Sequence, residues 1–349
     1  MSLASIYTTR CTGRGVGVAA LFPPAHTTFF GFARQALVDA LRRSGVGAGD
    51  AVLIPGFICR DVLASLAAVG AVPRYYDVDE ALRSDAAALD RAAPLGARAV
   101  VAVNYFGFPQ PLEPFRRWCQ GTNTTIIEDN AHGLLSRDGD VPLGHRADFG
   151  VFSFRKTLAV PNGAALVDGR AVPVPATLSI YRGSPRGLEW RYRAKTAMRL
   201  AMGLGGVRAA RVLIDASRMM QRALSGERRR HSSAESEHVV PQASLAPLTM
   251  QLLAAVDIDA ECERRRALYR ECRERFDRVG DVHPIFPDLA PGVVPQGFPF
   301  FFTGADAPAF VARWWRVGVP IVPWPDLPEA VVADAPRHYR RAMLVPFLW

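Results

Sequence analysis

The chain has 349 residues, 49% of them hydrophobic, and a formal net charge of +9. Such a length and composition exclude a disordered or fibrous protein and suit one large domain plus a smaller one. The five cysteines are odd in number and scattered without a metal-ligand spacing, which predicts reduced thiols and no metal site.

The N-terminal stretch, residues 1–28, has little periodicity and is rich in Gly, Thr and Pro. It contains Arg10 and Arg14 and no long apolar run, so we expect no signal peptide. No later apolar run has the length of a membrane-spanning helix. These features together predict a cytoplasmic protein.

The next stretch, Phe29 to Leu41, reads as a glycine-containing turn that opens an amphipathic helix. Its first residues would expose unpaired N–H groups at the positive end of the helix dipole, an arrangement that favours phosphate. An ordinary amphipathic helix satisfies the same pattern, and both interpretations stay open.

Short apolar runs then alternate with helical patterns. Because repeated strand and helix units are typical of a parallel sheet, this alternation predicts a three-layer α/β/α domain with a mostly parallel sheet. The predicted strands are 51–55, 72–79, 99–103, 125–127 and 149–154, and the predicted helices between them include 62–69 and 112–119.

Polar side chains follow two of these strands at the point where each ends: Asp129 and His132 after the first, Ser153 and Lys156 after the second. Ligands of parallel sheets bind beyond the carboxyl ends of the strands, so we expect the four side chains to share one rim. An acid, an imidazole, a hydroxyl and an amine are the groups that a pyridoxal phosphate site needs. The lysine forms the Schiff base, and the acid keeps the pyridine nitrogen protonated.

Two motifs carry a resemblance to a known family. Glu128-Asp129-Asn130-Ala131-His132, and Ser153 followed by the spacing from Lys156 to Gly163, resemble the DegT/StrS-type sugar aminotransferases, a family of fold type I pyridoxal phosphate enzymes. The chain departs from the common family pattern because it has two residues fewer between Ser153 and Lys156. It is therefore identified as an atypical member.

The resemblance implies roles for these residues. Lys156 would form the Schiff base and later carry the proton, while Asp129 would pair with the pyridine nitrogen. Ser153 would donate to the cofactor phosphate. His132 would lie on the phenolic side of the ring, although a core histidine satisfied by the backbone is an equal alternative.

Further cofactor contacts are implied nearer the N-terminus. Ala33, Arg34 and Gln35 occupy the place where the family donates backbone N–H groups to the phosphate. Cys59 stands where many members have an aromatic residue that stacks on the ring, and Phe57 is the candidate replacement.

The positive charge is concentrated in residues 182–230, which hold thirteen Lys or Arg and three acids. Glycines at 203, 205 and 206 predict two helices joined by a bend. A basic amphipathic pair can lie on an anionic membrane surface, and a solvated arm that packs on the sheet or on a second subunit is the favoured alternative.

The C-terminal part resembles the family's small domain. It begins with one long predicted helix, 245–276, followed by a strand at 294–302 and a helix at 307–317. The predicted organisation is a large cofactor-binding domain, 1–244, and a small α+β domain, 245–349.

The resemblance implies a homodimeric aminotransferase with shared active sites, no nucleic-acid partner, and pyridoxamine phosphate as the intermediate cofactor form. An amino acid such as glutamate would be the donor, and a nucleotide-linked keto-sugar in polysaccharide or secondary-metabolite biosynthesis would be the acceptor. The alternative is a non-catalytic relative that acts as a binding or membrane-surface scaffold.

Overall fold

The computed structural model describes residues 17–170, 177–178, 183, 186–197, 240 and 242–348. Most of the basic segment 182–230 lies outside the described residues, and so do the predicted bend and the proposed membrane contact. Within that segment, residues 186–197 are helical.

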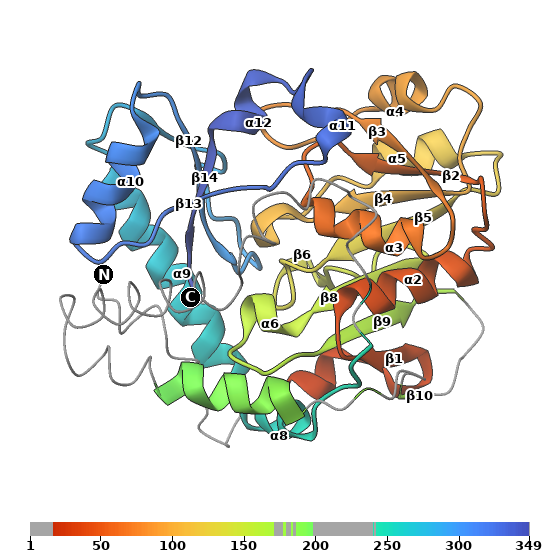
Figure 1. Ribbon diagram of the computed structural model, residues 1–349, viewed down its shortest axis with the longest axis horizontal. Helices are drawn as coiled ribbons and strands as arrows, with labels where there is room; N and C mark the ends of the chain where they lie inside the picture. Colours follow the sequence, from red (N-terminus) through yellow and green to blue (C-terminus); the bar gives the residue numbers. More distant parts are fainter. Residues whose placement is uncertain are drawn as a thin grey trace, which may run out of the picture.

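A large eight-stranded sheet forms the centre of the molecule (Figure 1). Its strand order is β10-β1-β9-β8-β5-β4-β2-β3, and the neighbours from β8 to β3 are parallel, whereas β9 runs antiparallel to both β8 and β1. The strands are β1 Thr27–Phe30, β2 Ala51–Pro55, β3 Val72–Tyr76, β4 Ala99–Val103, β5 Thr125–Asn130, β8 Phe149–Ser153, β9 Ala164–Asp168 and β10 Thr177–Leu178.

Helices follow the parallel strands as the alternation predicted. Helices α2 and α3 pack against each other in front of the sheet in Figure 1, and α4 packs against α5. Their bounds are α2 Ala33–Arg43, α3 Leu63–Ala67, α4 Ala86–Ala92, α5 Glu113–Cys119 and α6 Phe154–Thr157. The predicted α/β fold with a mostly parallel sheet is therefore confirmed.

The sequence of the central strands explains why they are buried. All five residues of β4 are buried, as expected of a parallel strand covered on both faces. In β8, a Cβ atom added at Gly150 would lie 1.7 Å from the carbonyl oxygen of Gly144. Only glycine at this position lets the 144–147 turn pack against the strand that leads to Lys156.

A second, antiparallel sheet of four strands lies beside the large one, drawn in blue in Figure 1. Its order is β11-β12-β14-β13, with bounds β11 Val282–Pro284, β12 Gly297–Phe302, β13 Val322–Pro323 and β14 Ala342–Pro346. Helix α9 packs on β12 through stacked rings of Phe276 with Phe298 and Phe300. The remaining helices are α10 Ala307–Arg316, α11 Glu329–Val332 and α12 Arg337–Arg341, and β6 Arg137–Asp138 pairs with β7 Val141–Pro142 in a separate ribbon.

The predicted single helix 245–276 is wrong, because the structure has two helices there, α8 Pro247–Ala255 and α9 Ile258–Phe276. Val256 is extended, with ψ at 130°, and Asp257 caps the start of α9 by accepting a hydrogen bond from the N–H of Ala260. An Asp that can bind the backbone in this way favours a new helix start over helix continuation.

The two helices differ in what most of their apolar residues contact. Leu253 of α8 packs with Val18 and Phe22 from the N-terminal part of the chain, and the start of α9 joins the same cluster through Ile258 and Cys262. The rest of α9 packs on the small sheet. The predicted domain boundary at 244/245 stays a prediction. None of the helices in the described part of the chain has the length and apolar character needed to cross a bilayer.

Candidate active site

A pocket opens where β2, β5 and β8 end, at the rim predicted from the sequence. Its volume is about 110 Å³, and Asp129, Ser153 and Lys156 all line it. Ala33 and Arg34, the first residues of α2, form the facing wall. We call it the Lys156 pocket, and it brings together side chains that lie up to 124 positions apart in the numbering, from Phe32 to Lys156.

Lys156 is held on the short helix α6, which starts directly after Ser153 ends β8. The compact turn explains how the shortened interval between the two residues still keeps both in the pocket. The amine is half-buried, and its Nζ lies 3.1 Å from Nε2 of His132.

His132 is 4% exposed, and burial followed by the nearby positive charge of Lys156 lowers its pKa well below the usual value. The ring is therefore neutral near pH 7. The backbone N–H of Phe106 donates to Nδ1 at 3.2 Å, so the single ring proton is on Nε2 and faces Nζ. The amine beside it is a nucleophile of the kind that attacks carbonyl carbon.

Asp129 is half-buried, and one of its oxygens accepts a hydrogen bond of 2.9 Å from the N–H of Ala131. Loss of water raises the pKa of Asp129, while the positive charge of Lys156 and the hydrogen bond of Ala131 act in the opposite direction. None of the described residues forms a close ion pair with this carboxylate. The site therefore suits a cationic partner such as a protonated pyridine nitrogen.

Two guanidinium groups and a thiol also line the pocket: those of Arg34, Arg155 and Cys59. The pKa of Arg155 is lowered by loss of water and then by the positive charge of Arg34, which indicates two cations close together. Loss of water also raises the pKa of Cys59, which keeps the thiol protonated. Such a pair of cations beside Ser153 and a helix start is suited to a phosphate group.

Three residues of the predicted set do not line this pocket: His132, which reaches it only through its contact with Lys156, Gln35 and Phe57. Gln35 is fully buried, and its side chain instead accepts from the N–H of Phe32 and donates to the carbonyl of Ala243. Phe57 is also fully buried and packs against Trp324 and Tyr339. Cys59 does line the pocket, and Phe32 is the aromatic residue in its wall.

An ion pair below the rim supports the strand that carries Asp129. Glu128 is fully buried and receives two hydrogen bonds from the Arg146 guanidinium, at 2.6 and 2.8 Å. The amide of Asn104 donates to the same carboxylate oxygen of Glu128 at 2.8 Å. The two neighbouring acids therefore differ in role: Glu128 is paired with Arg146 and Asn104 inside the fold, and Asp129 lines the pocket.

Sequence reasoning missed a connection from the small domain to Lys156. Arg265 of α9 is fully buried beside Glu261 and donates to the carbonyl oxygens of Thr157 and Gln296. Thr157 directly follows Lys156, so the guanidinium holds the backbone of the helix that carries the Lys156 amine. The sequence offered only a run of three arginines on a charged helix, which gives no sign that one of them is buried.

Further contacts connect the small domain to His132. The N–H of Gln296 donates to the carbonyl of Phe106 at 2.8 Å, and the N–H of Phe106 donates to His132. Trp324 of the small domain packs against His132, with ring centroids 5.4 Å apart. Lys156 and His132 are therefore positioned from both domains.

The residues of the pocket fit pyridoxal phosphate. A carboxylate without a close cation matches the ring nitrogen of the cofactor, and a lysine matches its aldehyde. A hydroxyl and two guanidinium groups match its phosphate. Among the described residues there is no cluster of His, Cys, Asp or Glu that could hold a metal ion.

Comparison with known proteins agrees with this class of site. Residues 18–169 match the model of the DegT/DnrJ/EryC1/StrS aminotransferase family. The chain is 36% identical over 140 residues to L-glutamine:2-deoxy-scyllo-inosose aminotransferase of Micromonospora echinospora, a match covering 39% of this chain and 33% of the relative. It is 29% identical over 162 residues to UDP-N-acetyl-3-dehydro-alpha-D-glucosamine 3-aminotransferase of Acidithiobacillus ferrooxidans, which covers 46% of this chain and 43% of the relative.

The fold extends further than the sequence match. The crystal structure of DesV from S. venezuelae superposes with a TM-score of 0.63 over 94% of this chain and 81% of that chain, at 20% identity. At this identity the superposition shows the fold alone.

The fold and the pocket define a fold type I, aminotransferase-like protein. Residues 18–169 are similar to the DegT/DnrJ/EryC1/StrS aminotransferase family, which confirms the predicted resemblance, and the chain spans less than half the length of the two relatives. The family description and both relatives' names are those of aminotransferases, in agreement with the predicted enzyme class. The family depends on pyridoxal phosphate, in agreement with the predicted cofactor.

Proposed function

We propose that this protein is a pyridoxal phosphate-dependent aminotransferase that moves an amino group from an amino acid to a keto-sugar. The observation that carries the proposal is the pairing, within one pocket, of Lys156 facing neutral His132 with Asp129 that lacks a close cation. The family match and the names of the two relatives support the same activity.

The roles of the residues follow from their places in the pocket. Asp129 would hold the ring nitrogen, while Ser153, Arg34 and Arg155 would hold the phosphate. When bound, the cofactor supplies an electron-withdrawing ring that stabilises negative charge on the substrate carbon. His132, whose Nδ1 accepts from the N–H of Phe106, would fix the position of the Lys156 amine through its Nε2.

After release from the cofactor, the Lys156 amine is the group placed to take a proton from the substrate carbon and return it. Half-buried Asp129 and the phosphate-binding cations would then keep the ring fixed while that proton moves. Pyridoxamine phosphate would be the second form of the cofactor. Cys59, a small residue in the pocket wall, would leave the face of the ring open to a bulky acceptor.

The substrates are proposed from the relatives. One relative is named for glutamine as donor and a cyclic ketone as acceptor, and the other for a UDP-linked keto-sugar. An amino acid of the glutamate or glutamine kind is the proposed donor here. A nucleotide-linked keto-sugar in polysaccharide or secondary-metabolite biosynthesis is the proposed acceptor. A homodimer in the cytoplasm, with active sites shared between subunits, is part of the same proposal.

The chain offers an unusually clean test because Lys156 and Lys195 are its two lysines. Titration of the protein with pyridoxal phosphate should produce the visible absorbance band of lysine-bound cofactor. The band should be lost in Lys156→Ala and kept in Lys195→Ala, the matched control. A band that survives in Lys156→Ala overturns the assignment.

Donor use is measured on the same sample. Glutamate and glutamine are added separately, and the working donor should convert the visible band to the shorter-wavelength absorbance of pyridoxamine phosphate. Keto-sugar acceptors are then screened by recovery of the first band. If the protein binds the cofactor but no amino acid shifts the absorbance band, the result would favour the non-catalytic alternative.

A further inference from the structure

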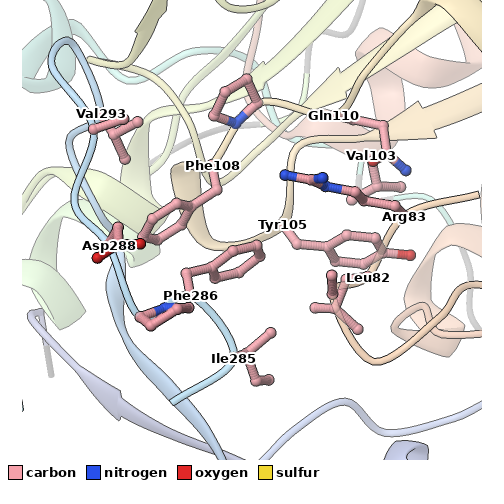
Figure 2. A pocket seen from close by; sticks show the side chains of 14 residues that line it. Leu82, Arg83, Val103, Tyr105, Phe108, Gln110, Ile285, Phe286, Asp288 and Val293 are labelled. Carbon is pink, nitrogen blue, oxygen red and sulfur yellow. The ribbon is translucent and has the colours of Figure 1, made fainter.

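A second, larger pocket lies between the end of β4 and the 285–293 loop of the small domain, and we call it the Arg83 pocket. Its volume is about 360 Å³, within the range of small-molecule sites. Among its lining residues are Arg83, Tyr105 and Phe286 (Figure 2), and it shares no lining residue with the Lys156 pocket.

Ring stacking and hydrogen bonds fix the walls of the Arg83 pocket. The rings of Phe108 and Phe286 stack at 4.0 Å with an angle of 8°. On helix α9, the side chains of Tyr269 and Arg266 donate to backbone carbonyls of the 285–293 loop. Across the pocket, Tyr105 is fixed by a hydrogen bond of 2.7 Å to the carbonyl of Phe57. A rigid aromatic surface of this kind suits a flat ring.

Gln110 leaves a hydrogen-bond donor unused in this wall. Its side chain is 3% exposed, and its amide nitrogen Nε2 is buried without a partner among the described residues. A buried donor without an acceptor destabilises the fold unless something supplies the acceptor. Because Gln110 lines the pocket, a bound molecule can supply it.

Arg83 brings a charge to the same place. In Figure 2 its side chain is directed from its loop toward the group of Tyr105, Phe108 and Phe286. The loop is fixed, since the N–H of Arg83 donates to Asp79 and its carbonyl accepts from the N–H of Asp79. No ion pair joins the Arg83 guanidinium to another described residue, so it is available for an anion.

We propose that the Arg83 pocket binds a small organic anion that carries a flat ring. Its carboxylate or phosphate pairs with the Arg83 guanidinium, and its ring lies against Tyr105 and Phe108. A ring oxygen accepts the hydrogen bond of Gln110. One acid, Asp288, also lines the pocket, which favours a ligand whose negative charge is confined to one end.

The test is calorimetric titration of the full chain with uridine 5′-monophosphate and with benzoate, which separate a phosphate from a carboxylate. Uridine and inorganic phosphate serve as the ring and the anion alone. At least one of the two ring anions should bind, and the isolated halves should bind at least about tenfold more weakly. Failure of both ring anions to bind at millimolar concentration overturns the proposal.

Three variants locate the binding. Arg83→Ala should weaken it by about tenfold or more, whereas Arg91→Ala, a nearby exposed arginine that does not line this pocket, should leave it unchanged. Gln110→Leu should weaken binding several-fold and yet keep or raise the melting temperature, because it removes an unsatisfied donor. Equal affinities in Arg83→Ala and the unsubstituted protein contradict the proposal.

Lys156→Ala separates this proposal from the proposed function. Binding of the ring anion should persist in that variant, because the two pockets have no residue in common. Loss of binding there would show that the ligand had entered the Lys156 pocket, and the proposal would fall while the aminotransferase assignment stood.

Discussion

The large and small domains contribute to the Lys156 pocket in different ways. The large domain supplies every described residue that lines the pocket, from the ends of parallel strands and one helix start. The small domain supplies none of these, yet its Arg265 holds Thr157 and its Trp324 packs on His132. The reacting groups and their support thus come from separate parts of the chain, and substitutions in the two domains should have different signatures.

The largest effect should come from Arg265→Met. This change leaves Glu261 buried without its closest fully buried partner, so the free energy of unfolding should fall by about 3 kcal/mol or more in chemical denaturation. Arg264→Met is the matched control. Arg264 also pairs with Glu261 but does not contact the helix of Lys156, and it should cost less.

The triple variant Glu261→Leu/Arg264→Met/Arg265→Met separates the positioning of Lys156 from stability, because Glu261 pairs with both arginines. Replacing a whole group of buried ion pairs with apolar side chains often restores stability. We expect it to do so here while cofactor attachment to Lys156 stays impaired, since the carbonyl of Thr157 has lost its donor. Attachment at the normal rate and affinity in a stable triple variant would show that the small domain does not position Lys156.

In the large domain, Asp129→Asn should lower activity without lowering stability. The pKa of Asp129 is raised in the folded chain, so above its ordinary value of 3.8 the fold disfavours the charged form. The cofactor-free variant should therefore be as stable as the unsubstituted protein or more stable. Its transamination rate should fall by about 100-fold or more, because removing one group that stabilises charge in the transition state typically costs this much. A less stable variant with full activity contradicts this account.

The difference between pocket-lining residues in the large domain and supporting residues in the small domain also explains which of them the sequence could predict. Asp129, Ser153 and Lys156 follow apolar strands directly, so strand order and strand polarity were enough to place them on one rim. Arg265 has no such signal, because burial of one arginine in a charged helix depends on Glu261 and on carbonyls far along the chain.

Two other residues show the same limit. Gln35 was predicted to offer its backbone N–H to a phosphate, and in the structure that N–H donates to the carbonyl of Phe32 at 3.0 Å while the side chain bridges to Ala243. The break between α8 and α9 depends on the capping contact of Asp257, which competes with helix continuation in a way that apolar periodicity does not reveal.

His132 should give a smaller, pH-dependent effect. Its pKa is lowered in the folded chain, so the unfolded chain binds the extra proton more readily, and stability falls as pH drops below about 6.5. At pH 5.5 the loss from this residue should be at most about 1.4 kcal/mol relative to neutral pH. Denaturation of the unsubstituted protein and of His132→Gln at both pH values measures it, and an equal pH dependence in the two contradicts a neutral His132.

The smallest predicted effect is at the start of α9. Asp257→Ala removes the capping hydrogen bond to the N–H of Ala260 and should cost about 1 kcal/mol of unfolding free energy. Glu263→Ala is the control, since that exposed residue makes only a surface ion pair with Arg270 and should cost a few tenths of that. Equal losses in the two variants would mean that the cap does not define the break between the helices.

The most direct test of the central claim is to find which amine holds the cofactor. The protein is loaded with pyridoxal phosphate, reduced with borohydride, digested and mapped by mass spectrometry. Because the chain has two lysines, the account predicts one labelled peptide, the one that contains Lys156. Label on Lys195, or no label on Lys156 at saturating cofactor, would contradict it.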